Sequence, residues 1–166
     1  MNRTKKLRLY FSYNQFMVFD SSVELPGCAW TKLHSDQGFA RRDSVVNFET
    51  VLEFGHADVG IRIGAYEHNS VHERVIAVPF HVESGLVRIE GPEENPSDRR
   101  IPITAGHYRL YCAQQVTNDD DLHGEERIDL FFEPLEHPAE HSEIIVADAD
   151  LHPPAQLVED AEIAGQ

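Results

Sequence analysis

An alternation of apolar and polar residues with a period of two constrains the fold more than any other feature of the sequence. Apolar Leu7, Leu9 and Phe11 stand at every second position of one segment, and residues 59–63 repeat the pattern. Successive side chains of a β-strand point to opposite faces, so this pattern predicts strands with one buried face. No stretch of twelve or more residues keeps the 3.6-residue period of an α-helix. The sequence therefore predicts an all-β chain.

Short apolar runs separated by turn residues predict the other strands. They lie at residues 16–19, 44–48, 75–82, 86–89, 108–113, 128–132 and 144–146. The turn at 83–85 contains Gly85 and suits a hairpin between its flanking strands. Pro79 lacks a backbone N–H, which favours a sheet edge or a bulge at that position. Residues 24–43 are less regular and predict a long connection with one short helical turn at 31–37.

Eight or nine short strands in a chain of 166 residues predict a single-domain antiparallel β-sandwich. We expect the sandwich domain to span residues 1–150. The acidic residues 151–166 are weakly apolar, and we expect them to form a carboxyl-terminal tail, either a frayed helix or a disordered segment.

The charge of the chain is concentrated in its last third. Residues 1–116 hold 14 acidic residues against 13 Lys and Arg, a net charge of −1. Residues 117–166 hold 15 acidic residues against the single Arg127, a net charge of −14, which accounts for most of the total of −15. Such a surface repels nucleic acid and steers cationic partners toward it. We therefore expect a protein partner and no direct binding of nucleic acid.

The densest acidic cluster lies between two predicted strands, so the folded body would present it as a recognition loop. It consists of Asp119, Asp120, Asp121, Glu125 and Glu126. Carboxylates can occupy the positions where the cationic groove of a nucleic-acid enzyme expects phosphates. Aromatic residues contribute strongly to protein interfaces, and Trp30, Phe39, Tyr66 and Tyr111 are candidate anchors. Of these, Trp30, the only tryptophan, is assigned to the partner-binding site.

The residues make no positive case for catalysis or for a cofactor. The sequence has no Gly-x-Ser-x-Gly, no phosphate-binding loop and no dinucleotide glycine pattern. His68 and His72 have a spacing that would align them on a helix, but they lie in a predicted loop, so no metal site is predicted. Cys28 and Cys112 are far apart in apolar surroundings, which predicts two reduced, buried thiols.

The amino terminus does not resemble a signal peptide, because Arg8 and Ser12 interrupt the apolar run that follows Lys5 and Lys6. No other window approaches the length of a membrane span. We therefore expect a cytoplasmic protein that does not insert into a membrane.

Several local motifs resemble, in the same order, landmarks of the competence protein J family. These are FSYNQF at 11–16, VF at 18–19, WT at 30–31, QGFA at 37–40, VNFE at 46–49, VPFHV at 78–82 and AGHYRLYC at 105–112. No single motif is a catalytic signature, and their joint order carries the resemblance. The part from Glu133 onward extends beyond the core that the family shares.

The resemblance implies a small bacterial protein that binds and silences a cognate DNA-entry nuclease, a nonspecific and metal-dependent endonuclease. Where that nuclease is a toxin, it implies an immunity protein. The alternative from another class is a β-sandwich enzyme or a module that binds a small molecule such as a sugar. A large concave pocket with converging polar groups would favour the alternative, whereas a flat or convex acidic face would favour the inhibitor.

Overall fold

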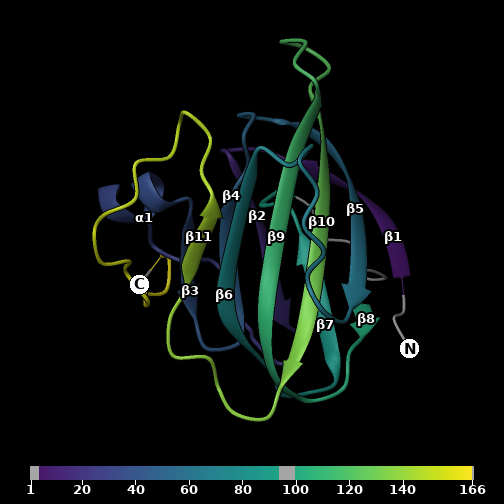
Figure 1. Cartoon of the computed structure of the whole chain (residues 1–166), viewed down its shortest axis with the longest axis vertical. Helices are drawn as coiled ribbons and strands as arrows, with labels where there is room; N and C mark the ends of the chain where they lie inside the picture. The colour runs from purple at the N-terminus through teal and green to yellow at the C-terminus, as the bar shows by residue number, and fades with distance from the viewer. Residues whose placement is uncertain (1–3, 94–99, 166) are drawn as a thin grey trace.

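Two β-sheets pack face to face and enclose the hydrophobic core (Figure 1). The computed structural model describes residues 4–93 and 100–165. The strands are β1 (Thr4–Phe11), β2 (Gln15–Asp20), β3 (Phe39–Arg42), β4 (Val45–Glu49), β5 (Gly55–Ile63), β6 (Arg74–Val82), β7 (Leu86–Glu90), β8 (Arg100–Pro102), β9 (Gly106–Asn118), β10 (Glu125–Leu135) and β11 (Glu143–Val146). One helix, α1 (Lys32–Gln37), is present among these residues.

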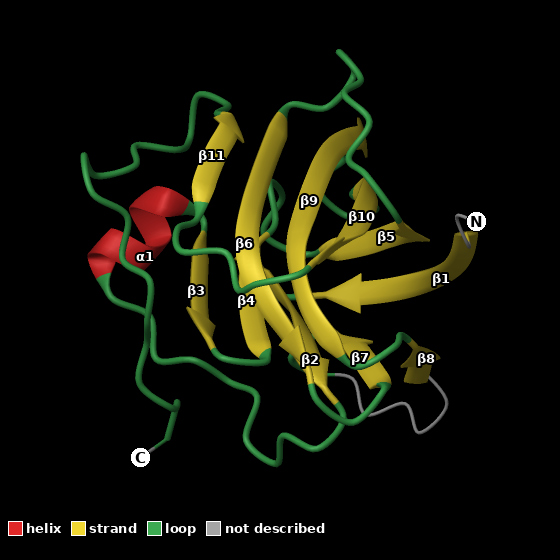
Figure 2. Ribbon diagram, turned by 60° about the horizontal axis from the view of Figure 1, so that its bottom comes forward, coloured by secondary structure: helices red, strands yellow, loops and turns green. Residues whose placement is uncertain are grey.

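The two sheets differ in size. The larger has the strand order β1-β5-β10-β9-β6-β11, and the smaller has the order β3-β4-β2-β7-β8 (Figure 2). All strand pairs are antiparallel except β5 and β10, which run parallel. The predicted all-β sandwich is therefore confirmed, with eleven strands among the described residues rather than eight or nine. The strand β3 lies inside the stretch predicted as an irregular connection.

The hairpin predicted around residues 83–85 is wrong, because its two strands belong to different sheets. The strand β6 pairs with β9 and β11, whereas β7 pairs with β2 and β8. The side chain of Asp20 holds the crossover, since its Oδ1 accepts hydrogen bonds from the N–H groups of Glu83 and Ser84 at 2.9 and 3.0 Å. Pro79 lies beyond the part of β6 that pairs with β11, as expected for a sheet edge.

Alternating residues of both sheets fill the core. Leu9, Phe11, Val59 and Ile61 are buried, as the period-two pattern requires, and Phe132 is fully buried from β10. Both cysteines are free and buried, as predicted. Burial raises the pKa of the Cys112 thiol well above its ordinary value, which keeps the thiol protonated and unreactive.

The short helical turn predicted near residues 31–37 is confirmed as α1. Thr31 caps its amino end in a capping box with His34, and Gly38 ends it with a φ of 85°. The helix has six residues, and no helix of the described residues is long and apolar enough to cross a membrane.

The carboxyl-terminal segment, residues 151–165, is not a frayed helix or a disordered tail. It lies against α1 and β3 (Figures 1 and 2) and contains no helix. The side chains of Gln37 and Arg41 donate hydrogen bonds to the carbonyls of Val158 and Glu159 at 2.9 and 2.8 Å. Leu151 is buried in the main core. The expectation failed because these contacts come from backbone carbonyls, which side-chain composition does not reveal.

Candidate functional site

Three connections meet at one end of the sandwich, which we call the hairpin end. They are the turn at 13–14, the loop at 50–54 and the loop at 119–124 that joins β9 to β10 and rises at the top of Figure 1. The N–H of Asn14 donates to the carbonyl of Glu53 at 2.8 Å. The N–H of His56 donates to the carbonyl of Gly124 at 3.1 Å. The loop at 50–54 and the start of β5 therefore link the other two connections.

The loop at 119–124 corresponds to the segment that the sequence predicted as a recognition loop, shortened by two residues. Asp119, Asp120 and Asp121 are exposed in it. Asp120 also organises the loop, because its Oδ1 accepts the N–H groups of Leu122 and His123 at 2.8 and 3.2 Å. Asp119 and Asp121 therefore present charge to solvent, while Asp120 has a structural role as well.

Glu125 and Glu126 do not belong to the loop, since both lie in β10. Glu125 pairs with Arg8, which also binds Asp58 at 2.9 Å. These two carboxylates raise the pKa of Arg8. Glu126 is buried, and its Oε2 accepts the N–H of Leu52 at 2.9 Å. Glu126 therefore faces the interior and fastens the loop at 50–54, which corrects its predicted place on the partner-binding surface.

Burial sets the protonation of Glu126. Its side chain lies between the sheets at the base of the hairpin, and desolvation raises its pKa from 4.5 to about 7. The hydrogen bonds from the N–H groups of Leu52 and Val51, and the charge of Arg74, act in the opposite direction. Near neutral pH this carboxyl group is therefore partly protonated.

Trp30 lies beside the turn at 13–14 and is half-buried. Its indole Nε1 donates to Oε1 of Gln15 at 3.2 Å, and its ring meets that of His34 edge-on. It lines a depression of about 240 Å³ together with Tyr13 and Asn14. The structure thus places Trp30 next to the hairpin end, with part of its surface accessible. Of the other candidate anchors, Phe39 is fully buried in the core, which corrects that expectation, and Tyr66 and Tyr111 stack on each other.

Sequence reasoning missed three apolar side chains of the hairpin end. Tyr13, Phe54 and Leu122 are 71%, 41% and 77% exposed, and all three lie on the connections that meet there. Leu122 gave a signal, because it is an isolated apolar residue inside an acidic run. Tyr13 gave another, because it stands next to Asn14 in a tight turn between two strands.

The charge of the hairpin end is not neutralised. Across residues 4–93 and 100–165, no ion pair involves Glu53, Asp119, Asp120 or Asp121. Away from this end, carboxylates such as Asp58 and Asp129 are held by arginines. Exposed carboxylates without a cation create a field that attracts positive charge.

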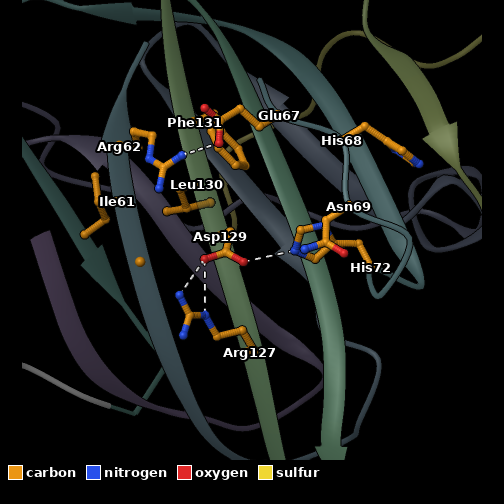
Figure 3. A pocket seen from close by; sticks show the side chains of 11 residues that line it. Ile61, Arg62, Glu67, His68, Asn69, His72, Arg127, Asp129, Leu130 and Phe131 are labelled. Carbon is orange, nitrogen blue, oxygen red and sulfur yellow. Dashed lines mark hydrogen bonds and ion pairs between the residues drawn. The ribbon is translucent and has the colours of Figure 1, made fainter. Parts of the chain in front are cut away.

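A second polar site lies on the outer face of the larger sheet (Figure 3). Asp129 accepts hydrogen bonds from Arg127 at 3.0 Å and pairs with Nε2 of the buried His72 at 2.9 Å. Arg62 pairs with Glu67 at the rim. These groups line a depression of about 210 Å³, below the roughly 300 Å³ at which small-molecule sites begin. This depression by itself therefore gives no support for a sugar-binding module or an enzyme. An adjoining depression of about 360 Å³ shares Arg127 with it and has Lys6 and Asp58 as its other charged lining residues. The buried Nδ1 of His72 has no hydrogen-bond partner among the described residues.

His68 and His72 do not form a metal site together. His68 lies 3.2 Å from the hydroxyl of Tyr66, while His72 binds Asp129. In the part of the chain that the structure describes, no group of three or more His, Cys, Asp or Glu side chains converges as a metal ion would require.

Comparison with known proteins places these features in a family context. The chain matches the model of the Competence protein J (ComJ) family over residues 8–133. A Bacillus subtilis (strain 168) protein described as a DNA-entry nuclease inhibitor is 29% identical over 121 residues, which cover 73% of this chain and 89% of that protein.

Two solved structures are similar. The crystal structure of ComJ from Bacillus subtilis, described as an inhibitor of the DNA degrading activity of NucA, matches with a TM-score of 0.66 and 27% identity, covering 80% of this chain and 98% of that one. The structure of crocagin biosynthetic gene J matches with a TM-score of 0.53 over 79% of this chain and 97% of the other. At 15% identity, that match supports the fold alone. The family match includes all three connections of the hairpin end and leaves out β11 and the carboxyl-terminal segment.

Proposed function

The chain belongs to the competence protein J family, and from that premise we propose that it binds and inhibits a DNA-degrading nuclease of the DNA-entry type. A similar protein of Bacillus subtilis is described as a DNA-entry nuclease inhibitor, and a similar crystal structure from Bacillus subtilis is described as ComJ, inhibitor of the DNA degrading activity of NucA. Both alignments cover most of the other protein's length, 89% and 98%, so the similarity extends through the whole fold of those relatives. This family membership is the observation that carries the proposal.

The hairpin end is the proposed contact surface. Asp119 and Asp121 project from a hairpin loop that the body anchors, and no cation of the described residues pairs with them. A nuclease that cleaves DNA binds phosphates through cationic groups, and exposed carboxylates can form charge-assisted hydrogen bonds with the same groups. The proposed mechanism is therefore occupation of the phosphate-binding surface, which excludes DNA without any chemical step.

An inhibition assay tests the proposal. The purified chain is mixed with a DNA-entry-type nuclease from the same genome, and cleavage of plasmid DNA is followed at increasing ratios of chain to nuclease. We expect cleavage to stop near equal amounts and the two proteins to elute together in size-exclusion chromatography. The chain alone should leave the DNA intact. Undiminished cleavage at saturating chain would refute the proposal.

The ionic strength dependence tests the acidic mechanism separately. Steering by exposed charges is screened within about 8 Å at physiological salt. We therefore expect the association rate to fall steeply as salt increases. A rate of association that does not change with salt, together with full inhibition, would support the inhibitor function and contradict the phosphate-mimicking surface.

An inhibitor of this kind would act as an immunity protein where its producer makes a toxic nuclease. We propose a cytoplasmic location for it, which cell fractionation tests.

A further inference from the structure

We propose that Tyr13, Phe54 and Leu122 form the hydrophobic anchor of the interface with the cationic DNA-binding surface of the nuclease. The inference rests on the proposed function and adds a set of contacts that charge does not supply. Interfaces commonly combine a desolvated apolar centre with a polar or charged rim, and a few anchors carry most of the binding energy. The hairpin end has both components.

The three side chains come from connections that contact one another. Asn14, next to Tyr13, donates its N–H to the carbonyl of Glu53, next to Phe54, at 2.8 Å. A Cβ atom placed on Gly124 would lie 3.2 Å from the carbonyl oxygen of Phe54, so the hairpin loop that carries Leu122 is packed against the loop at 50–54. Three large apolar residues are thus exposed on one connected surface.

Tyr13 has a backbone conformation that its side chain does not favour. Tyr13 and Asn14 have φ values of 54° and 56°, and two consecutive residues with positive φ are typical of a type I′ turn. Asn tolerates this region, whereas a bulky residue there is an outlier. The ring is 71% exposed, so packing within the chain does little to offset the strain. Backbone strain of this kind clusters at active sites and ligand-binding regions, which agrees with a binding role for Tyr13.

The charge around the three side chains identifies the occupant. Glu53, Asp119 and Asp121 are exposed on the same loops as Phe54 and Leu122, so a second copy of the chain would bring two uncompensated acidic loops together. Like charges placed opposite each other across an interface oppose binding. A cationic surface with apolar parts of its own complements the hairpin end, and the DNA-binding face of a nuclease has that chemistry.

A single substitution at Tyr13 should change stability and binding in opposite directions, which allows the two effects to be measured separately. Asn is a preferred first central residue of a type I′ turn, so Tyr13→Asn should raise the melting temperature by about 2–4 °C. The same change removes the ring, and we expect the inhibition constant to rise at least about tenfold. Leu122→Ser should weaken inhibition in the same way without lowering the melting temperature. Leu25→Ser is the matched control, because Leu25 is 52% exposed and lies near Arg42, away from the hairpin end.

Each outcome has one meaning. Wild-type inhibition together with weakened Tyr13→Asn and Leu122→Ser variants supports the anchor. Wild-type inhibition with either variant at full strength overturns the three-residue anchor and leaves the proposed function in place. A wild-type chain that fails to inhibit overturns the proposed function and the anchor together. Light scattering of the chain alone tests whether a second copy of the chain occupies this surface instead. If the wild-type chain is a dimer and Tyr13→Asn makes it a monomer, the surface binds a second copy, and the assignment to the nuclease is overturned.

Discussion

Two acidic regions of this molecule use their carboxylates in opposite ways. In the hairpin loop, Asp119 and Asp121 are exposed and enter no ion pair among the described residues. After β10, Asp148 binds the buried Arg74 through both oxygens at 2.9 and 3.0 Å, and Glu159 accepts the N–H of Ser142 at 2.7 Å. Local charge density alone therefore does not identify a binding surface. What distinguishes the two regions is whether each carboxylate already has an ion-pair or hydrogen-bond partner within the chain.

The largest expected effect comes from the pair of Arg74 and Asp148. Arg74 is 1% exposed, and its Nη1 also donates to the carbonyl of Glu49 at 3.0 Å. Asp148→Ala leaves a buried guanidinium without its counterion, so we expect a loss of about 3–5 kcal/mol in the free energy of unfolding, measured by urea denaturation. Replacing both partners by apolar residues, Arg74→Met with Asp148→Leu, should recover part of that loss. A single variant as stable as the wild type would contradict the structural role of this acid.

Glu126 tests the base of the hairpin through pH. Its pKa is raised from 4.5 to about 7 in the folded state, so the folded chain holds a proton that the unfolded chain releases between these values. This contribution to stability is present below about pH 4.5 and is lost as pH rises through about 7. Glu126→Gln should therefore increase stability at pH 8, by up to about 3 kcal/mol, and flatten the pH dependence measured by thermal unfolding. Identical pH profiles for the two proteins would show that Glu126 is not the titrating group.

Deletion of residues 153–166 should have a smaller effect on stability. It removes the carbonyls that accept hydrogen bonds from Gln37 and Arg41, and leaving buried donors without partners costs about 1–3 kcal/mol each, less where water replaces the segment. We expect a loss of about 2 kcal/mol in chemical denaturation and an unchanged rate of association with the nuclease. A deletion variant that stays stable but loses inhibition would make this segment the binding element instead of the loop.

The smallest energetic effect is expected at the loop itself. Asp119→Asn with Asp121→Asn removes two charges and keeps Asp120, which organises the loop. We expect association to slow about three- to tenfold at low salt and by less at high salt, measured by stopped-flow mixing, with stability unchanged within about 0.5 kcal/mol. Glu136→Gln with Glu140→Gln is the matched control, because both residues are exposed beyond β10 and the change in net charge is the same. Equal slowing by both pairs would indicate an effect of net charge without a defined site.

Sequence reasoning predicted the features that depend on local periodicity. The alternation around Leu9 and Ile61 predicted buried faces, and the capping residues of α1 lie at the ends of the segment predicted as a helical turn. It failed where distant backbone decides the structure. Arg41 is buried in β3 because it binds the carbonyl of Glu159, which lies 118 residues away in the sequence. A charged residue at a buried position breaks the apolar pattern, so the segment FARR was not predicted as a strand. The turn at 83–85 changes sheets because Asp20 binds it.

The candidate site was predicted only in part, because some of its features depend on contacts between distant segments. The hairpin loop was found because its three aspartates stand between two apolar runs, but the sequence did not show that Glu126 faces inward. Its burial depends on the register of β10 with β5, where Glu126 lies opposite the buried Ala57. Tyr13 and Phe54 were missed because only the folded chain brings their loops to the hairpin loop.

The pair of Arg74 and Asp148 has a consequence for how the chain folds as it is synthesised. The two residues are separated by 74 positions, and Asp148 follows β11, so every strand leaves the ribosome before the counterion of Arg74 does. Until Asp148 emerges, the nascent chain carries a guanidinium that it cannot bury at low cost, because an unpaired charge in the interior is strongly unfavourable. We therefore expect the sandwich to close fully only after this aspartate has emerged. A chain that ends before Asp148 should remain loosely packed and prone to aggregation and proteolysis. Complete chains can then close their core around Arg74, whereas incomplete chains that lack this carboxylate cannot.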